Sequence, residues 1–194
     1  MYNTWKELEE AIKNCKKCKL NANRTNIVFG MGNKNAEIML IGEGPGADED
    51  KRGLPFVGKA GQLMDKAFDG LKIDREKLYI ANIVKCRPPL NRVPEEDEAE
   101  ACLDYLRNQV ILVNPKIIVL MGSTALKNIL GKDFGITSAR GKWIERKDIL
   151  YMPTWHPAAL LRDDTKKIDF WKDFKEVTNK AQEIGINILI DEKD

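Results

Sequence analysis

The sequence predicts a single α/β domain, spanning residues 1–194, in which helices cover both faces of a largely parallel sheet. Short apolar runs with the character of buried strands alternate along the chain with longer segments of helical periodicity. The length of 194 residues suits one domain with its own core, and no repeat or low-complexity linker divides it. Parallel strands need crossover connections, so this alternation favours a sheet that is buried on both sides.

The first predicted element is a helix from Trp5 to Lys13. Thr4 and Glu7 have the spacing of a capping box, which satisfies free backbone N–H groups at the start of a helix. Leu8 and Ile12 then recur at helical spacing. The helix is expected to end just before a loop rich in lysine and cysteine.

The middle of the chain alternates strands and helices. We expect three buried strands, over residues 37–42, 78–84 and 116–121. Helices are expected from Lys59 to Leu71, from Pro94 to Ile111, where proline suits a helix start, and from Ser123 onward. The segment 43–58 is rich in glycine and proline and is expected to be a loop.

The last part of the chain extends the same pattern. Residues 143–152 are expected to form a hairpin or two short strands, which lead into the loop 153–157. A helix from Lys166 to Ile184 and a final strand from Asn187 to Ile190 complete the expected fold. Because ligands bind beyond the carboxyl ends of parallel strands, a site is expected in the loops at those ends.

Charge and hydropathy narrow the class of protein. The formal net charge is only +2, but basic residues gather beside the loops rich in glycine, proline and cysteine. Any one cluster is explained by a solvated face, but several beside the same loops favour a surface that faces phosphate groups. The sequence shows no signal peptide and no apolar run long enough to span a membrane. A cytoplasmic protein is therefore expected.

The four cysteines form two pairs, Cys15/Cys18 and Cys86/Cys102. Disulfides are rare in a reducing compartment, so the sulfurs are either buried thiols or metal ligands. Cys15 and Cys18 lie in a lysine-rich loop, and their C-x2-C spacing lets both thiolates reach one centre. Cys102 shares a helical face with apolar neighbours, so a buried thiol remains an alternative there. Ligation by thiolates alone suits zinc or an iron–sulfur cluster, and the spacing does not choose between them.

Polar residues stand at the ends of three predicted strands. The glycines around Glu43 suit close approach of a ligand to the backbone, but they match neither phosphate-binding glycine motif. Asn82 lies inside a buried strand, where an amide without partners costs on the order of 1–3 kcal/mol. Its carbonyl and amino groups complement the N3–H and O4 of uracil, although bonds to neighbouring backbone are an alternative. His156 is the only histidine, and its loop position makes it either an acid–base candidate or a structural residue.

Four sequence motifs follow one another along the chain: Gly-Glu-Gly-Pro-Gly at 42–46, Gly-Leu-Pro-Phe-Val-Gly at 53–58, Tyr-Ile-Ala-Asn-Ile-Val-Lys-Cys-Arg-Pro-Pro at 79–89 and Trp-His-Pro-Ala-Ala-Leu-Leu-Arg at 155–162. In combination they resemble the family 4 uracil-DNA glycosylases, the iron–sulfur enzymes of the thermophile type. The resemblance runs from Cys15 to about Trp171. It implies a three-layer α/β/α sandwich around a central four-stranded, mainly parallel sheet. It also implies an enzyme that flips uracil out of DNA and hydrolyses its N-glycosidic bond, leaving an abasic site.

The resemblance implies roles for the residues of these motifs. Phe56 would stack on the flipped base, Asn82 would read its edge, and His156 would bond the uracil O2. Glu43 would shape the pocket and help to position the attacking water, and Glu49 is a second candidate for that role. Two loop glycines, Gly42 and Gly44, are also expected to contact the substrate.

By the same resemblance, a structural 4Fe–4S cluster is expected on the four cysteines: Cys15, Cys18, Cys86 and Cys102. The segment Leu160, Leu161 and Arg162 resembles the family's intercalation loop, in which an apolar side chain fills the gap left by the flipped base. A short amphipathic helix that packs its leucines inward is an equal alternative. Arg87, in one of the basic clusters, is a further candidate for contact with DNA.

Two rival functions remain open. Changes in the loops of the same fold could direct excision to other deaminated bases, such as hypoxanthine or xanthine. The chain could instead be a non-catalytic iron–sulfur module that binds DNA. Residues 51–53 lack the histidine of a related group that becomes trapped covalently on DNA, so turnover is expected. The expected partner is uracil-containing DNA, single- or double-stranded, bound by a monomer; the sequence does not specify a sliding-clamp partner.

Overall fold

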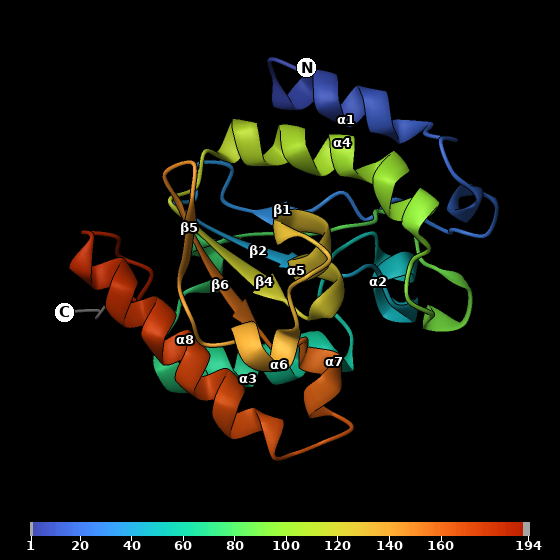
Figure 1. The fold of residues 1–194 in the computed structure, drawn as a ribbon. Helices are drawn as coiled ribbons and strands as arrows, with labels where there is room; N and C mark the ends of the chain where they lie inside the picture. Colours follow the sequence, from blue (N-terminus) through green and yellow to red (C-terminus); the bar gives the residue numbers. More distant parts are fainter. Residues whose placement is uncertain (1, 192–194) are drawn as a thin grey trace.

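The computed structural model describes residues 2–191, which are built around one sheet (Figure 1). Within that range the sheet has six strands in the order β1-β3-β2-β4-β6-β5. Their bounds are Met31–Gly32 (β1), Ile38–Gly42 (β2), Tyr79–Asn82 (β3), Ile117–Met121 (β4), Ile144–Arg146 (β5) and Ile149–Thr154 (β6). The four central strands are parallel, and β1 and β5 are antiparallel at the two edges. The sheet is therefore mainly parallel, as expected, but it has two short edge strands beyond the expected four.

Helices cover both faces of the sheet and make three layers (Figure 1). One face carries α1 (Trp5–Lys13), α4 (Glu96–Val113) and α5 (Ser123–Leu130), and the other carries α3 (Lys59–Leu71), α7 (Pro157–Leu160) and α8 (Lys166–Glu183). Successive side chains of β2 point to opposite faces, so Met39 and Ile41 join the first core and Ile38 and Leu40 the second. This double burial explains why the central strands are continuous apolar runs.

The remaining helical segments are short and lie in the connections. They are α2 (Ala47–Arg52), α6 (Ile136–Ala139) and the 3₁₀ turns at Lys19–Ala22, Arg75–Lys77 and Pro89–Asn91. The helix α2 falls within the segment 43–58, which was expected to be a loop throughout. Its sequence, Ala-Asp-Glu-Asp-Lys-Arg, places acidic residues in the first turn and basic residues in the last, which suits the helix dipole.

The helices α1 and α3 begin and end at the predicted residues, and α5 begins at Ser123 as predicted. The final strand predicted from Asn187 to Ile190 is wrong, because this segment makes only an isolated bridge between Leu189 and Ile73. Ile186 and Ile188 are buried, which explains the apolar alternation. The backbone of Ile188 and Ile190 pairs with the turn after α3, whereas the N–H of Ile186 donates to Ala181 of α8. Apolar residues here therefore report burial and not sheet pairing.

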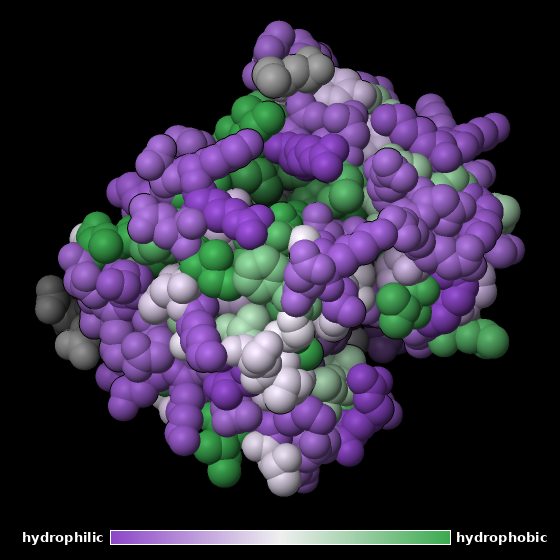
Figure 2. Space-filling view, in the orientation of Figure 1, coloured by the Kyte–Doolittle hydropathy of each residue, from purple (hydrophilic) through white to green (hydrophobic). Residues whose placement is uncertain are grey.

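The face shown in Figure 2 is mostly hydrophilic, as expected for a chain in which 32% of the residues are charged. Across residues 2–191, none of the helices combines the length and the apolar character that crossing a bilayer requires.

Candidate active site

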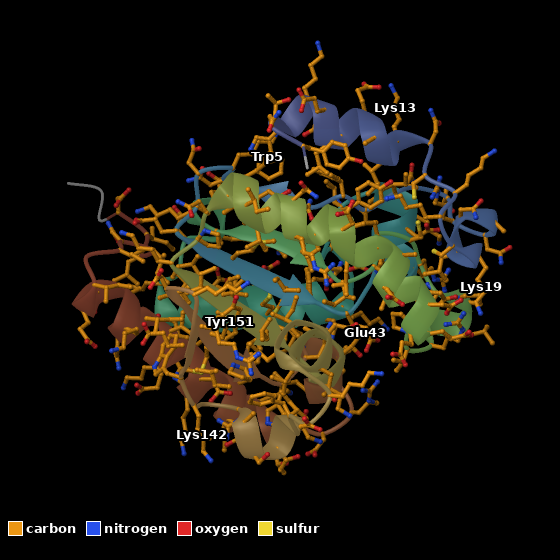
Figure 3. All side chains as sticks on the ribbon, turned by 45° about the horizontal axis from the view of Figure 1, so that its top comes forward. Trp5, Lys13, Lys19, Glu43, Lys142 and Tyr151 are labelled. Carbon is orange, nitrogen blue, oxygen red and sulfur yellow. The ribbon has the colours of Figure 1, made fainter. Side chains whose placement is uncertain are left out.

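A cavity of about 380 Å³ opens beyond the carboxyl ends of the parallel strands. The motifs that lie far apart in the sequence meet there, because β2, β3 and β6 all end at this edge of the sheet. Figure 3 labels Glu43 at this edge, directly after β2 and beside α5. The cavity is lined by predicted site residues from all four motifs, and by Glu49 between the first two: Glu43, Gly44, Glu49, Phe56, Asn82, His156 and Arg162.

Asn82 presents an unpartnered acceptor to this cavity. It ends β3 and pairs in register with Gly42 at the end of β2. Its side chain is buried, and Oδ1 has no hydrogen-bond partner among the described residues. A Cβ atom on Gly42 would lie 2.5 Å from this oxygen and 2.6 Å from Cζ of Phe56. Glycine at position 42 therefore leaves room for both side chains. The buried oxygen of Asn82 is free to accept a hydrogen bond from a ligand.

His156 presents a donor to the same cavity. Its Nδ1 accepts a hydrogen bond of 3.1 Å from the backbone N–H of Ala158, at the start of α7. The neutral ring must then carry its proton on Nε2, which is buried and has no partner within residues 2–191. Burial, with a smaller contribution from the positive charge of Arg162, lowers the pKa of His156 to about 4. The imidazole is thus a neutral donor at physiological pH.

The backbone around His156 depends on a second glycine. Gly122, directly after β4, has a φ of +90°, and a Cβ there would lie 2.8 Å from Cβ of His156. Its N–H donates to the oxygen of Thr154, the last residue of β6. Thr154 in turn donates to Asp173 of α8 at 2.7 Å, and Asp173 also pairs with Arg140. The strand end that carries His156 is therefore held from both sides.

Phe56 reaches the cavity through a strained backbone. Its φ is +52°, in the left-handed region that costs free energy for a bulky residue. Its ring centroid lies 5.6 Å from that of His156, with 36° between the planes. Arg75 holds this conformation by donating from Nη2 to the oxygens of Pro55 and Phe56, each at 3.1 Å. The guanidinium is itself fixed by an ion pair with Asp65.

The two candidate carboxylates differ in their surroundings. Glu49 accepts from three backbone N–H groups, those of Gly46 at 3.1 Å, Val57 at 2.9 Å and Gly58 at 2.7 Å. Its carboxylate therefore connects the loop before α2 to the loop that carries Phe56. Glu43 lines the cavity and accepts from the hydroxyl of Thr124, in the first turn of α5. Of the two, Glu43 has the surroundings of a group that faces substrate.

The predicted DNA-contact residues separate in the structure. Leu160 is only 2% exposed and packs in the core under α7, so its expected insertion into DNA is wrong. Leu161 follows at the C-cap of α7 and is 50% exposed. Arg162 lines the cavity, whereas Arg87 lies outside its lining, and Nε of Arg87 donates to Asn91 at 2.8 Å. Leu160 therefore packs inward, as the helical alternative predicts, whereas insertion of Leu161 into DNA stays a prediction.

The four cysteines line a second, smaller cavity, together with Arg24 and Lys85. They come from the turn after α1, the loop after β3 and the buried face of α4, and all four are free thiols. Nη1 of Arg24 donates to Sγ of Cys86 at 3.2 Å. Burial raises the pKa of Cys102 to about 11, and it also raises the pKa values of Cys18 and Cys86. In the part of the chain described, no three His, Cys, Asp or Glu side chains are placed to hold a single metal ion.

Sequence reasoning missed several residues that position the site. Lys85 is fully buried and donates from Nζ to the oxygen of Asn82 at 3.0 Å and to Oε1 of Gln109 at 2.6 Å. Burial lowers the pKa of this lysine to about 8. Arg75 was also missed. No sequence signal marks either residue, because a lysine or arginine beside a loop ordinarily indicates solvent exposure.

Comparison with known proteins identifies the family of this chain. Residues 29–179 match the model of the uracil DNA glycosylase superfamily. The fold and the cavity thus define a member of that superfamily.

The chain is also 45% identical to a type-4 uracil-DNA glycosylase of Sulfurisphaera tokodaii, over 90% of this chain and 84% of that protein. It is 44% identical to a type-4 uracil-DNA glycosylase of Thermotoga maritima, over 83% and 85% of the two chains. A type-4 uracil-DNA glycosylase of Pyrobaculum aerophilum is 41% identical, over 86% and 89%. The chain belongs to the type-4 uracil-DNA glycosylases, which confirms the resemblance seen in its motifs.

Proposed function

We propose that this chain releases uracil from DNA by hydrolysing the N-glycosidic bond. One observation carries the proposal: a buried acceptor, Asn82 Oδ1, and a buried donor, His156 Nε2–H, both without partners in the described chain, line one cavity beside an aromatic ring. Uracil offers N3–H and O2 at neighbouring positions on its edge, which complements this pair. Cytosine has no hydrogen on N3 and would leave the Asn82 oxygen unpaired, at a cost of about 1–3 kcal/mol.

The same donor serves the chemical step. Cleavage of the glycosidic bond leaves negative charge on the uracil ring, including O2, so a group that binds this oxygen more tightly as charge develops lowers the barrier. His156 is neutral and its orientation is fixed by the bond that its Nδ1 accepts. A preorganised donor of this kind contributes about 2.7–4 kcal/mol. Phe56 stacks on the base, and the phosphates of the DNA stabilise the cationic sugar.

Water completes the reaction from the side of Glu43. The carboxylate of Glu43 lines the cavity and is oriented by Thr124, which supports a role in positioning the attacking water. Glu49 is a positioning residue in this proposal, because its carboxylate already accepts three backbone hydrogen bonds. Gly42 and Gly44 leave space for the base and for neighbouring side chains.

The substrate is DNA from which the uracil has been flipped. Leu161 is exposed beside the cavity mouth and Arg162 lines the cavity, which supports insertion of the leucine and contact of the arginine with phosphate. Arg87 is a further phosphate contact in this proposal. The enzyme acts as a monomer of one domain in the cytoplasm, where reducing conditions keep cysteines available as ligands.

The four cysteines fit a 4Fe–4S cluster. All four line one cavity, and the cations Arg24 and Lys85 beside them would balance the negative charge of thiolates and cluster. A cluster of several irons holds its ligands farther apart than a single ion does, which is consistent with the absence of a single-ion site among residues 2–191. The cluster, when bound, would crosslink the turn after α1, the loop after β3 and α4, and it would supply no step of the hydrolysis.

The test is excision from a labelled oligonucleotide that contains one uracil. The expected result is an abasic site, revealed as a strand break after alkaline treatment, only in the uracil-containing strand. Matched duplexes with cytosine, thymine, hypoxanthine or xanthine at the same position serve as controls and separate the rival excision activities. Retention of uracil after prolonged incubation with the iron-loaded protein would contradict the proposal.

A further inference from the structure

The loop between β3 and α4 carries a leucine that stands in solvent on a strained backbone. Leu90 is 96% exposed, more than any other large hydrophobic residue described. Leu90 and Asn91 both have positive φ, of 55° and 56°. This conformation is rare for bulky residues and persists only where the surroundings impose it, most often at functional sites. In Figure 2 hydrophobic side chains stand out at the lower right, where Figure 1 draws this loop.

Hydrogen bonds and an ion pair fix the conformation of the loop between β3 and α4. The N–H of Asn91 donates to the oxygen of Pro88 at 3.1 Å, and Nε of Arg87 donates to Oδ1 of Asn91 at 2.8 Å. Arg92 forms a two-pronged ion pair, with both bonds at 2.7 Å, to the buried carboxylate of Glu98 on α4. These bonds hold the leucine side chain in water, although turning it inward would bury apolar surface and be favoured by the hydrophobic effect.

The loop between β3 and α4 forms part of the opening of the candidate active site. Pro88, Asn91, Arg92 and Val93 line the cavity that also contains Asn82. Val93 is itself 60% exposed and extends the apolar edge. The other exposed leucine of this region, Leu161, follows α7, whose residues line the same cavity. Two protruding leucines, from two different loops, therefore flank one opening.

We propose that Leu90 is a second DNA wedge, which inserts into the base stack beside the flipped nucleotide. This inference rests on the proposed function, since a wedge is useful only where a base leaves the stack. An extruded nucleotide leaves both a vacant space in its own strand and an unpaired base opposite, so a second apolar side chain has a place to insert. The loop's continuity with the base cavity, and the guanidinium of Arg87, which donates to the neutral amide of Asn91, favour duplex DNA as the occupant over an apolar protein partner.

The test compares Leu90→Ala with the wild type on duplex and single-stranded DNA that contain the same uracil. Single-turnover excision from the duplex is expected to fall at least about ten-fold, whereas excision from the single strand stays within about two-fold, because a single strand has no stack to support. Ile111→Ala is the matched control, since Ile111 is also an exposed hydrophobic, 52% exposed, and lies on α4 outside the cavity lining. It should leave both activities unchanged.

A second readout does not depend on excision. A duplex that already contains an abasic site carries 2-aminopurine opposite that site, and binding of the wild type should raise its fluorescence as the stack is disturbed. Leu90→Ala should bind with little rise, and Leu90→Met should restore it. Leu90→Gly, which relieves the positive φ, should lose duplex excision without a fall in melting temperature. This last result separates a wedge from a residue that merely supports the fold.

The outcomes distinguish the inference from the proposed function. If the wild type releases no uracil from either substrate, the proposed function and this inference both fail. If the wild type is active and Leu90→Ala equals it on duplex DNA, or loses both substrates equally, the wedge is wrong and the proposed function stands. A change in the oligomeric state of Leu90→Ala would assign the leucine to a protein contact instead and would also overturn the wedge.

Discussion

The ammonium of Lys85 lies 3.0 Å from the main-chain oxygen of Asn82, and both residues are buried. The same lysine donates to Gln109 on α4 and lines the cavity of the four cysteines. The residue proposed to read the base is thus joined, through one buried cation, to the wall of the proposed cluster site. Loss of that cation should therefore disturb both cavities.

Lys85→Met is expected to reduce both stability and uracil excision. The substitution keeps much of the side-chain volume but leaves the oxygens of Asn82 and Gln109 buried without a donor, at a cost of about 1–3 kcal/mol each. Thermal unfolding and single-turnover excision measure the two effects. Lys172→Met on α8, an exposed lysine, is the matched control. A Lys85→Met protein as stable and as active as the control would show that this bond does not position Asn82.

The pH dependence of excision should lack the signature of an ordinary histidine. The pKa of His156 is lowered to about 4 by burial, so the imidazole stays neutral from about pH 5 upward and adds no inflection near pH 6.5. His156→Ala should lower the single-turnover rate by about 10²–10³-fold at every pH in this range. An inflection near pH 6.5 that disappears in the variant would refute the neutral-donor assignment.

The same pKa predicts how stability changes with pH. An unfolded histidine titrates near pH 6.5. Between that value and about pH 4 the unfolded chain therefore binds a proton that folded His156 does not. The contribution is fully present above pH 6.5 and is lost as the pH falls, by at most about 1.4 kcal/mol per pH unit. Denaturant unfolding from pH 7 to 5 measures this slope. His156→Gln should show a shallower slope, and equal slopes would contradict the lowered pKa.

Gly42→Ala should close the pocket without unfolding the protein. The added Cβ would lie 2.5 Å from Oδ1 of Asn82 and 2.6 Å from Cζ of Phe56, so one of these side chains must leave its place. Excision should fall by about 10²-fold or more, as expected when reacting groups are misplaced by about 1 Å. Gly135→Ala is the control, because its Cβ would meet only the hydroxyl of Ser138 at 3.4 Å. Near-normal activity of Gly42→Ala would contradict the assigned base position.

The iron–sulfur cluster proposed on the four cysteines predicts a coloured protein. Protein purified without oxygen should be yellow-brown, with broad visible absorption and about four irons per chain. Cys86→Ser and Cys102→Ser should lose colour and stability together, because the cluster would crosslink three segments of the chain. Cysteine-to-serine changes that leave iron content and melting temperature unaltered would contradict the cluster. A colourless, zinc-loaded and fully active protein would do the same.

Much of the fold follows from local patterns. The capping box at Thr4 and the helical spacing after it predict α1 to the residue, and the apolar runs locate the central strands within one or two residues. The apolar run in 187–190 gave a wrong strand, because Ile188 is buried with its backbone paired to the turn after α3 and not within the sheet. Periodicity reports which side chains are buried, and it does not report which backbone they face.

The sequence by itself determined the family, the order of most helices and strands, and most of the predicted residues that meet in the cavity, because these depend on residue types and their spacing. Only the tertiary structure decided that Leu160 is buried while Leu161 is exposed, and that Glu49 accepts three backbone hydrogen bonds while Glu43 accepts one from the hydroxyl of Thr124. It also placed Lys85 beneath Asn82 and left Leu90 in solvent. Exposure and hydrogen-bond partners arise from contacts between segments far apart in the chain, so neighbours in the sequence do not specify them.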